Sequence, residues 1–239
     1  GGCGYAGCDG YAAAVINGPN VQPNLCCAGG AEVSAAVAEL SGKAMGDAEP
    51  QVAFRRCDRI GGNVAEKFDY QGVLTCQGAK MLQEGPYACK YACLGYGDCV
   101  RACPFNAMSL QNKIVYIDPD ACTACGTCVR TCPNSILELV PKRSRVMVFC
   151  SSQDKAKEVT GVCEVGCISC MKCVKKCPAE AISMKNNRIH IDHEKCLAYG
   201  DACEEACVAA CPRKILRCLG SCAADVQMPQ AADAAAATT

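Results

Sequence analysis

The stretch CTACGTCVRTCP at residues 122–133 decides the fold, and CISCMKCVKKCP at residues 167–178 repeats its pattern. In each stretch three cysteines are separated by two residues, and a fourth follows after three residues and precedes a proline. Thiols at this spacing can wrap one face of a metal cluster, whereas the fourth thiol is turned away toward a second cluster. Two such runs in one chain are hard to reach by chance.

The pattern C-x2-C-x2-C-x3-C-P is the one that ligates cubane iron–sulfur clusters in bacterial ferredoxins, so it predicts an electron carrier. Cysteines make up 26 of the 239 residues, which also admits a secreted disulfide protein or a zinc-stabilised scaffold. Disulfides pair thiols in twos, and structural zinc prefers two C-x2-C pairs. These runs offer three cysteines plus one, so clusters are the favoured interpretation.

Composition and charge are consistent with cofactors that replace part of the core. The chain has no Trp and only four Phe, and its 24 basic residues balance 24 acidic ones. Each [4Fe–4S] cluster with four thiolates carries a charge of roughly −2, so five clusters would make the loaded protein acidic. No stretch reaches the roughly 18 apolar residues of a transmembrane helix. The thiols are expected in a reducing compartment.

A repeat organises the chain. A shift of 74 residues superposes six cysteine pairs, namely Cys76 on Cys150, Cys89 on Cys163, Cys93 on Cys167, Cys99 on Cys173, Cys103 on Cys177 and Cys122 on Cys196. Residues 103–122 match residues 177–196 without a gap, and strand-like residues 108–110 and 114–117 predict a hairpin between two cysteine runs. This is the layout of a two-cluster ferredoxin, so two of them are expected in tandem.

Two of the runs are irregular. CKYACLGYGDCVRACP at residues 89–104 has Tyr96 where the second copy has Cys170, so Cys89 is the expected substitute ligand. CLAYGDACEEACVAACP at residues 196–212 has stretched cysteine spacings of six, three and three residues.

The amino-terminal residues carry a family resemblance. GGCGYAGCDGYAAAV at residues 1–15, followed by NLCCAGG at residues 24–30, resembles the domain C-x2-C-x4-C…C-x-x-G-G at the front of the B subunit of the Rnf complex. Cys3, Cys8 and Cys26 match the second, third and fourth ligands of that domain. The first ligand would precede Gly1, and Cys27 lies one residue off the pattern.

The resemblance extends over nearly the whole chain and implies a function. Rnf complexes pass electrons from reduced ferredoxin to NAD⁺ and export sodium ions or protons. A B subunit would relay electrons from soluble ferredoxin, through four to five [4Fe–4S] clusters, to other subunits including the NAD-reducing one. It would work at the cytoplasmic face of the cell membrane, held by an amino-terminal helix absent from this sequence or by partner subunits. The alternative is a polyferredoxin electron carrier or a subunit of a hydrogenase or carbon monoxide dehydrogenase system.

Crossed ligation assigns the cysteines of the repeats. The first unit is expected to hold one cluster on Cys89, Cys93, Cys99 and Cys132, and another on Cys122, Cys125, Cys128 and Cys103. The second unit is expected to hold one on Cys167, Cys170, Cys173 and Cys211, and another on Cys196, Cys203, Cys207 and Cys177. Seven cysteines remain, namely Cys27, Cys57, Cys76, Cys150, Cys163, Cys218 and Cys222. They are either buried, reduced thiols or, for Cys76 and Cys150, extra ligands or redox-control groups.

The expected fold is therefore α+β, with a small four-cysteine domain before two ferredoxin-like units. The boundaries are 1–35 for the first domain, 36–75 for a linker with local structure, 76–145 and 146–222 for the two units, and 223–239 for a disordered tail. Val33, Val37 and Leu40 have helical spacing around the first boundary.

Two basic groups are candidate docking sites for an acidic ferredoxin, or solvated faces that offset cluster charge. They are Lys172, Lys175 and Lys176, and Lys142, Arg143 and Arg145. There is no phosphate-binding loop and no nucleophile–histidine pair, so this chain is expected to have no catalytic residue of its own. The basic residues lack interleaved aromatic residues, which gives no support to nucleic-acid binding.

Overall fold

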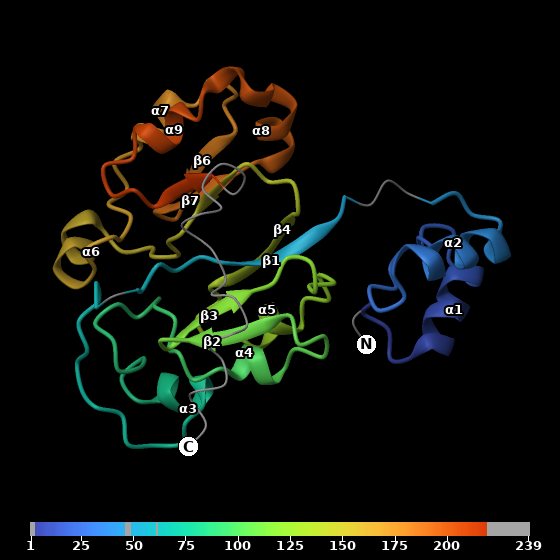
Figure 1. The fold of residues 1–239 in the computed structure, drawn as a ribbon, viewed down its shortest axis with the longest axis horizontal. Coiled ribbons are helices and arrows are strands. Elements are labelled where there is room, and N and C mark those ends of the chain that lie inside the picture. Colours follow the sequence, from blue (N-terminus) through green and yellow to red (C-terminus); the bar gives the residue numbers. More distant parts are fainter. Residues whose placement is uncertain (1–2, 46–48, 61, 219–239) are drawn as a thin grey trace.

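The computed structural model describes residues 3–45, 49–60 and 62–218, which form short helices and two-stranded sheets (Figure 1). The expected α+β class is confirmed. Cys222 and the predicted tail at 223–239 lie outside the described residues.

Two helices form the amino-terminal domain, α1 (Cys8–Asn17) and α2 (Gly30–Ser41), and they lie apart from the ferredoxin-like units (Figure 1). The hydroxyl of buried Tyr11 on α1 donates to the carbonyl of Gln22, 3.0 Å away. The side of α2 that packs inward is made by Ser34 and Ala38, whereas Leu40 is 88% exposed. The helical spacing predicted α2, and the structure places Val33 and Leu40 of that spacing on its exposed side.

The first ferredoxin unit contains two antiparallel strand pairs. β1 (Gln51–Arg55) pairs with β4 (Leu137–Pro141), and β2 (Met108–Gln111) pairs with β3 (Ile114–Ile117). Its helices are α3 (Cys76–Met81), α4 (Asp98–Arg101) and α5 (Thr127–Thr131). β1 lies inside the segment predicted as a linker, and its pairing makes it part of this unit.

The second unit repeats this arrangement. β5 (Val146–Val148) pairs with β8 (Leu216–Cys218), and β6 (Ile182–Lys185) pairs with β7 (Arg188–Ile191). Its helices are α6 (Ala156–Val162), α7 (Lys172–Lys176), α8 (His193–Tyr199), the 3₁₀ turn η1 (Gly200–Cys203) and α9 (Ala206–Ala209).

Both β-hairpins lie where the sequence predicts them. The turn residues Asn112 and Lys113 have positive φ, as do Asn186 and Asn187 in the second copy. Two successive residues with positive φ make the turn whose twist matches that of the flanking strands. Each hairpin therefore brings the two cysteine runs at its ends to one side of its unit.

Hydrogen bonds change one of the cysteine pairings that the shift of 74 residues predicts. Arg56 N donates to the carbonyl of Ile136 as Phe149 N donates to that of Ile215. The thiol of Cys57 accepts from Cys93 N, 36 residues away, and that of Cys150 accepts from Cys167 N, only 17 residues away, both at 3.3 Å. The structural counterpart of Cys150 is therefore Cys57. Cys76, which the shift of 74 pairs with Cys150, belongs to an insertion found in the first unit alone.

An apolar layer joins the two units. Val52 and Phe54 of β1 pack with Val140, Met147 and Phe149, whereas Ala53 between them faces the core of the first unit. The rings of Phe54 and Phe149 meet edge to face with centroids 4.9 Å apart. Because alternate residues of a strand point to opposite sides, β1 is covered on both faces. The two units are thus one packed body at this junction.

Ion pairs flank the apolar layer. Buried Arg56 lies 3.2 Å from a carboxylate oxygen of Glu138 and donates to the carbonyl of Cys150 in the second unit. Arg217 of the second unit forms an ion pair with buried Asp58 of the first. These contacts cross the junction and fix the position of one unit against the other.

Candidate metal centres

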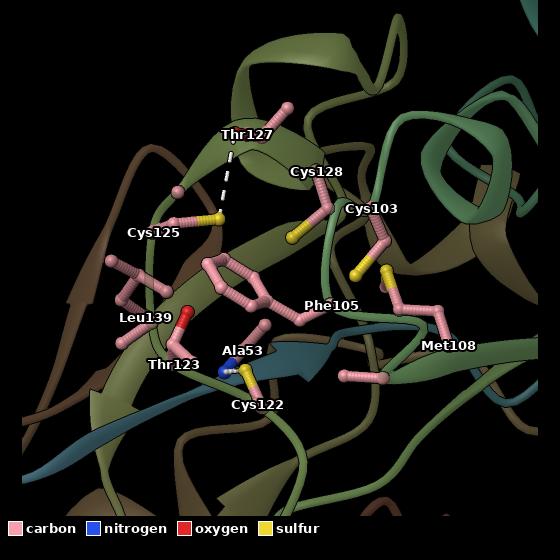
Figure 2. A pocket seen from close by; sticks show the side chains of 13 residues that line it. Ala53, Cys103, Phe105, Met108, Cys122, Thr123, Cys125, Thr127, Cys128 and Leu139 are labelled. Atoms are coloured by element: carbon pink, nitrogen blue, oxygen red, sulfur yellow. Dashed lines mark hydrogen bonds between the residues drawn. The ribbon is translucent and has the colours of Figure 1, made fainter. Parts of the chain in front are cut away.

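Set 2 consists of Cys103, Cys122, Cys125 and Cys128, which the crossed pattern predicts to meet. They line one pocket of about 330 Å³ in the first unit, part of it open to solvent, and Figure 2 shows their sulfur atoms around it with the ring of Phe105. Ala53 N donates to Cys122 Sγ at 3.4 Å. Burial raises the pKa of the Cys128 thiol to about 11, and the thiols of Cys122 and Cys125 add to the rise.

Set 3 is the corresponding group of the second unit and consists of Cys167, Cys170, Cys173 and Cys211. These four also line one pocket, of about 320 Å³, part of it open to solvent. Met171 precedes α7 with a φ of 57°, a left-handed turn that bends the run around the pocket. Burial raises the pKa of Cys167 to about 11, and the thiols of Cys150, Cys173 and Cys211 act in the same direction.

Set 1 differs from its prediction. Its pocket, of about 330 Å³, is lined by Cys93, Cys99 and Cys132 together with Cys76, the first residue of α3. Burial raises the pKa of Cys99 to about 12, followed by the effects of Cys93, Cys132 and Cys76. Cys89, the expected fourth member, does not line this pocket. The thiols that raise the pKa of Cys89, after burial, are those of Cys150 and Cys163 in the second unit.

Set 4 consists of the stretched-run cysteines Cys196, Cys203 and Cys207 with Cys177. Burial raises the pKa of Cys207 to about 12, and the thiols of Cys177, Cys196 and Cys203 all contribute, so the structure brings these four thiols near one another. The guanidinium of Arg145 donates to Cys203 Sγ at 3.8 Å and to a carboxylate oxygen of Glu205 at 2.6 Å. A guanidinium N–H that donates to a ligand sulfur therefore lies beside this set.

The amino-terminal cysteines are exposed or partly exposed to solvent. Burial raises the pKa of Tyr11, and the thiols of Cys26 and Cys3 contribute in the same direction, so these two cysteines lie near one ring. Cys8 begins α1 and is exposed. Burial also raises the pKa of Cys27, followed by the effect of Cys125, so Cys27 lies on the side of the amino-terminal domain that is near set 2.

The chemistry of sets 1 to 4 fits iron–sulfur clusters. Each is made of four thiols with free sulfur atoms, set in largely apolar surroundings. The raised pKa values of Cys99, Cys128, Cys167 and Cys207 keep these thiols protonated until metal binds. Iron would supply the positive charge that stabilises four thiolates together. Across residues 3–45, 49–60 and 62–218, no three His, Cys, Asp or Glu side chains are placed to hold a single metal ion. The cysteines of sets 1 to 3 each line a pocket instead, which suits a cluster better than zinc.

Sequence reasoning missed Cys76 as a member of set 1. The sequence signal was Tyr96, which stands where the second copy has Cys170. It indicated that this run lacks one thiol, but not which other cysteine supplies it. Cys89 is nearer in sequence, whereas Cys76 reaches the pocket because α3 packs beside α4, where Gln77 N donates to the carboxylate of Asp98 at 3.1 Å.

The fold and these sets define a doubled two-cluster ferredoxin. Consistent with this, the family model of the 4Fe-4S dicluster domain matches twice, at residues 87–136 and 166–215. The chain is 45% identical to the B subunit of the proton-translocating ferredoxin:NAD(+) oxidoreductase complex of Clostridium ljungdahlii, over 99% of this chain and 82% of that protein. It is 41% identical to the B subunit of the ion-translocating oxidoreductase complex of Methanosarcina acetivorans, over 90% of this chain and 80% of that protein.

A third relative is the B subunit of the Na(+)-translocating ferredoxin:NAD(+) oxidoreductase complex of Acetobacterium woodii, 40% identical over 89% of this chain and 62% of that protein. The chain belongs to the family of B subunits of ion-translocating ferredoxin:NAD⁺ oxidoreductase (Rnf) complexes. It is an electron-transfer subunit with ferredoxin-type [4Fe–4S] domains. None of its described helices is long and apolar enough to cross a bilayer.

Proposed function

We propose that this protein relays electrons from reduced soluble ferredoxin to the other subunits of an ion-translocating ferredoxin:NAD⁺ oxidoreductase, at the cytoplasmic face of the membrane. The observation that carries the proposal is the pairing of four-cysteine pockets within each ferredoxin unit. The clusters supply reversible one-electron storage. The chain supplies thiols, apolar cover and hydrogen bonds to sulfur, which set the potentials.

The proposed ligands follow the observed sets. Set 1 uses Cys76 in place of the predicted Cys89, and sets 2 to 4 use the predicted cysteines. Cys3, Cys8 and Cys26 are the proposed ligands of the amino-terminal site. This gives four clusters in the ferredoxin units and a fifth at the amino terminus.

Neighbouring sets provide a route for electrons. Cys27 of the amino-terminal domain lies near Cys125 of set 2, and Cys128 of set 2 lies near Cys99 of set 1. Within the second unit, α7 carries Cys173 of set 3 and is followed directly by Cys177 of set 4. Each unit therefore holds its two sets on adjoining elements, which favours transfer between them.

The exposed face of α7 is the proposed docking site for ferredoxin. Lys172, Lys175 and Lys176 are exposed, and no carboxylate of the described residues lies within ion-pair distance of them. The second basic group is neutralised, since Lys142 pairs with Asp120, Arg143 with Glu49 and Arg145 with Glu205. Unpaired positive charge beside a cluster set attracts an acidic partner.

The test is anaerobic purification followed by analysis of iron, zinc and acid-labile sulfide, and by electron paramagnetic resonance during reduction. We expect at least roughly 16 iron and matching sulfide per chain, with interacting cubane signals that appear when reduced ferredoxin is added. Zinc in place of iron, or iron centres that reduced ferredoxin leaves oxidised, would overturn the proposal.

A further inference from the structure

Three cysteines outside the four sets meet where the two units join. Burial raises the pKa of Cys89 to about 11, and the thiols of Cys150 and Cys163 act in the same direction. The thiol of Cys150 likewise contributes to the raised pKa of Cys163, after burial. One of these cysteines comes from the first unit and two from the second, so the group exists only because the units are packed together.

Cys57 lies at the same junction. It is buried in the core of the first unit, against which Cys89 and Cys163 also pack. Its neighbour Arg56 donates to the carbonyl of Cys150 at 3.2 Å. Beyond Cys57, Val64 forms a β-bridge with Cys163, and Glu164 N donates to the carbonyl of Asn63. The segment after Cys57 therefore lies alongside the segment that contains Cys163.

The four cysteines form two matched pairs. The repeat relates Cys89 to Cys163. Cys89 lies four residues before Cys93, and Cys163 lies four residues before Cys167. The hydrogen bonds to Cys93 N and Cys167 N relate Cys57 to Cys150. Each unit thus contributes the same two positions, and Cys163 contacts the first unit directly through its β-bridge with Val64.

This group, the junction cysteines, lies between set 1 and set 3. Cys57 contacts the backbone of Cys93 in set 1, and Cys150 contacts that of Cys167 in set 3. Cations surround it, since Arg213 donates to the carbonyl of Cys163 at 2.6 Å and Arg56 to that of Cys150. They would offset the negative charge of four thiolates and a cluster.

We propose that Cys57, Cys89, Cys150 and Cys163 bind a further [4Fe–4S] cluster at the junction of the two units. Cys89 and Cys163 pack against the core that contains Cys57. Arg56, next to Cys57, contacts the backbone of Cys150. Four cysteines at one junction are the number of ligands that a cluster of the kind inferred for sets 1 to 4 takes. The cluster accepts one electron from one unit and passes one to the other, and no bond is made or broken on the chain. Its electron-carrying role rests on the proposed function, whereas the binding of iron does not.

The first test uses the wild-type protein. Cys89, Cys150 and Cys163 are all partly exposed, so as free thiols they would react with iodoacetamide. We expect mass spectrometry to find them unmodified in the anaerobic, iron-loaded protein and modified after iron is removed. Modification of these three cysteines in the loaded protein, with sets 1 to 4 still protected, would overturn the proposal.

The second test removes one ligand from each unit. We expect Cys89→Ala/Cys163→Ala to lose about four iron and four sulfide relative to wild type and to keep the resonances of sets 1 to 4. Cys218→Ala, a buried cysteine outside every set, is the control and should lose none. Unchanged iron, or loss of zinc instead, would overturn the junction cluster. If the variant loses every cluster, the alkylation result decides. A wild-type protein without iron would overturn the proposed function itself.

Discussion

At the scale of single residues, set 1 shows how a segment distant in sequence supplies a cysteine to a pocket. Tyr96 stands where a regular run would have its second cysteine, and Cys76 reaches the pocket from α3. Tyr96 is itself held by a ring contact with Tyr70, at a centroid distance of 5.5 Å. The insertion that contains both Tyr70 and Cys76 therefore covers the side of the pocket that the run leaves open.

This replacement predicts a rescue. Cys76→Ala should lose up to about four iron, because three thiols remain in set 1. Adding Tyr96→Cys restores the regular spacing with Cys93 and Cys99 and should bring the iron content back to that of wild type. Iron analysis and electron paramagnetic resonance would measure both variants. If Tyr96→Cys instead restores iron lost by Cys89→Ala, Cys89 is the ligand and the assignment of Cys76 is wrong.

Arg145 predicts an effect on the potential of set 4. Its guanidinium lies beside Cys203 Sγ and favours the more negative, reduced state of a cluster bound there. Arg145→Met should lower the reduction potential of that cluster by on the order of tens of millivolts, the value of one hydrogen bond in a one-electron couple. A redox titration followed by electron paramagnetic resonance measures it. Arg143→Met, whose side chain pairs with Glu49 at the surface, is the control, and equal shifts in both variants would contradict the prediction.

At the scale of elements, local patterns predicted the hairpins well. Alternation at residues 114–117 and a polar turn are local signals, and both copies form the expected strand pairs. The pairing of β1 with β4 was not predictable in the same way, because it joins segments far apart in the sequence. Likewise, the spacing of Val33 and Leu40 could not show that Ser34 and Ala38 pack inward on α2.

The apolar layer between the units predicts a stability effect. Met147 on β5 is 1% exposed and packs against residues of β1 and β4. Met147→Ala should lower the free energy of unfolding by about 2–5 kcal/mol through lost burial and the cavity left behind. Denaturant unfolding of the iron-loaded protein under anaerobic conditions measures it. Met81→Ala on α3, 89% exposed, should change stability little. A similar, small effect of both substitutions would mean that the layer contributes little.

At the scale of the whole molecule, cysteines form a large part of the buried core of both units. Cys93, Cys99 and Cys128 are buried in the main cluster of the first unit, and Cys173 and Cys207 in that of the second. The regular runs made sets 2 and 3 predictable from sequence alone, because their ligands are local apart from one crossed cysteine. The junction cysteines could not be assigned in that way, since only the packing of the two units brings them together.

Metal removal should therefore unfold the tertiary structure. An iron chelator under reducing, anaerobic conditions should abolish the near-ultraviolet circular dichroism and the cooperative thermal transition, because clusters link the core segments. Reconstitution with iron and sulfide should restore both signals. An iron-free protein that melts cooperatively at the midpoint of the loaded protein would contradict this prediction.

The docking surface on α7 predicts a salt-dependent rate. Replacing Lys172, Lys175 and Lys176 with Glu should slow oxidation of reduced ferredoxin by about tenfold at low salt, with little difference at high salt. Stopped-flow measurements over a range of ionic strength would show it. Charge reversal at Lys142 and Arg143, which are already paired with carboxylates, is the control. Unchanged salt dependence after the α7 reversal would place docking elsewhere.

Crossed ligation also orders the assembly of the chain as it is synthesised. Set 2 is complete once Cys128 has been made, and set 1 only when Cys132 follows, although Cys76 has long been available. Set 3 waits for Cys211, near the end of the described chain. The first unit can thus be loaded with iron while the second is still on the ribosome. The junction cysteines become complete at Cys163, before either set of the second unit, so the first unit can serve as the template on which the second is built.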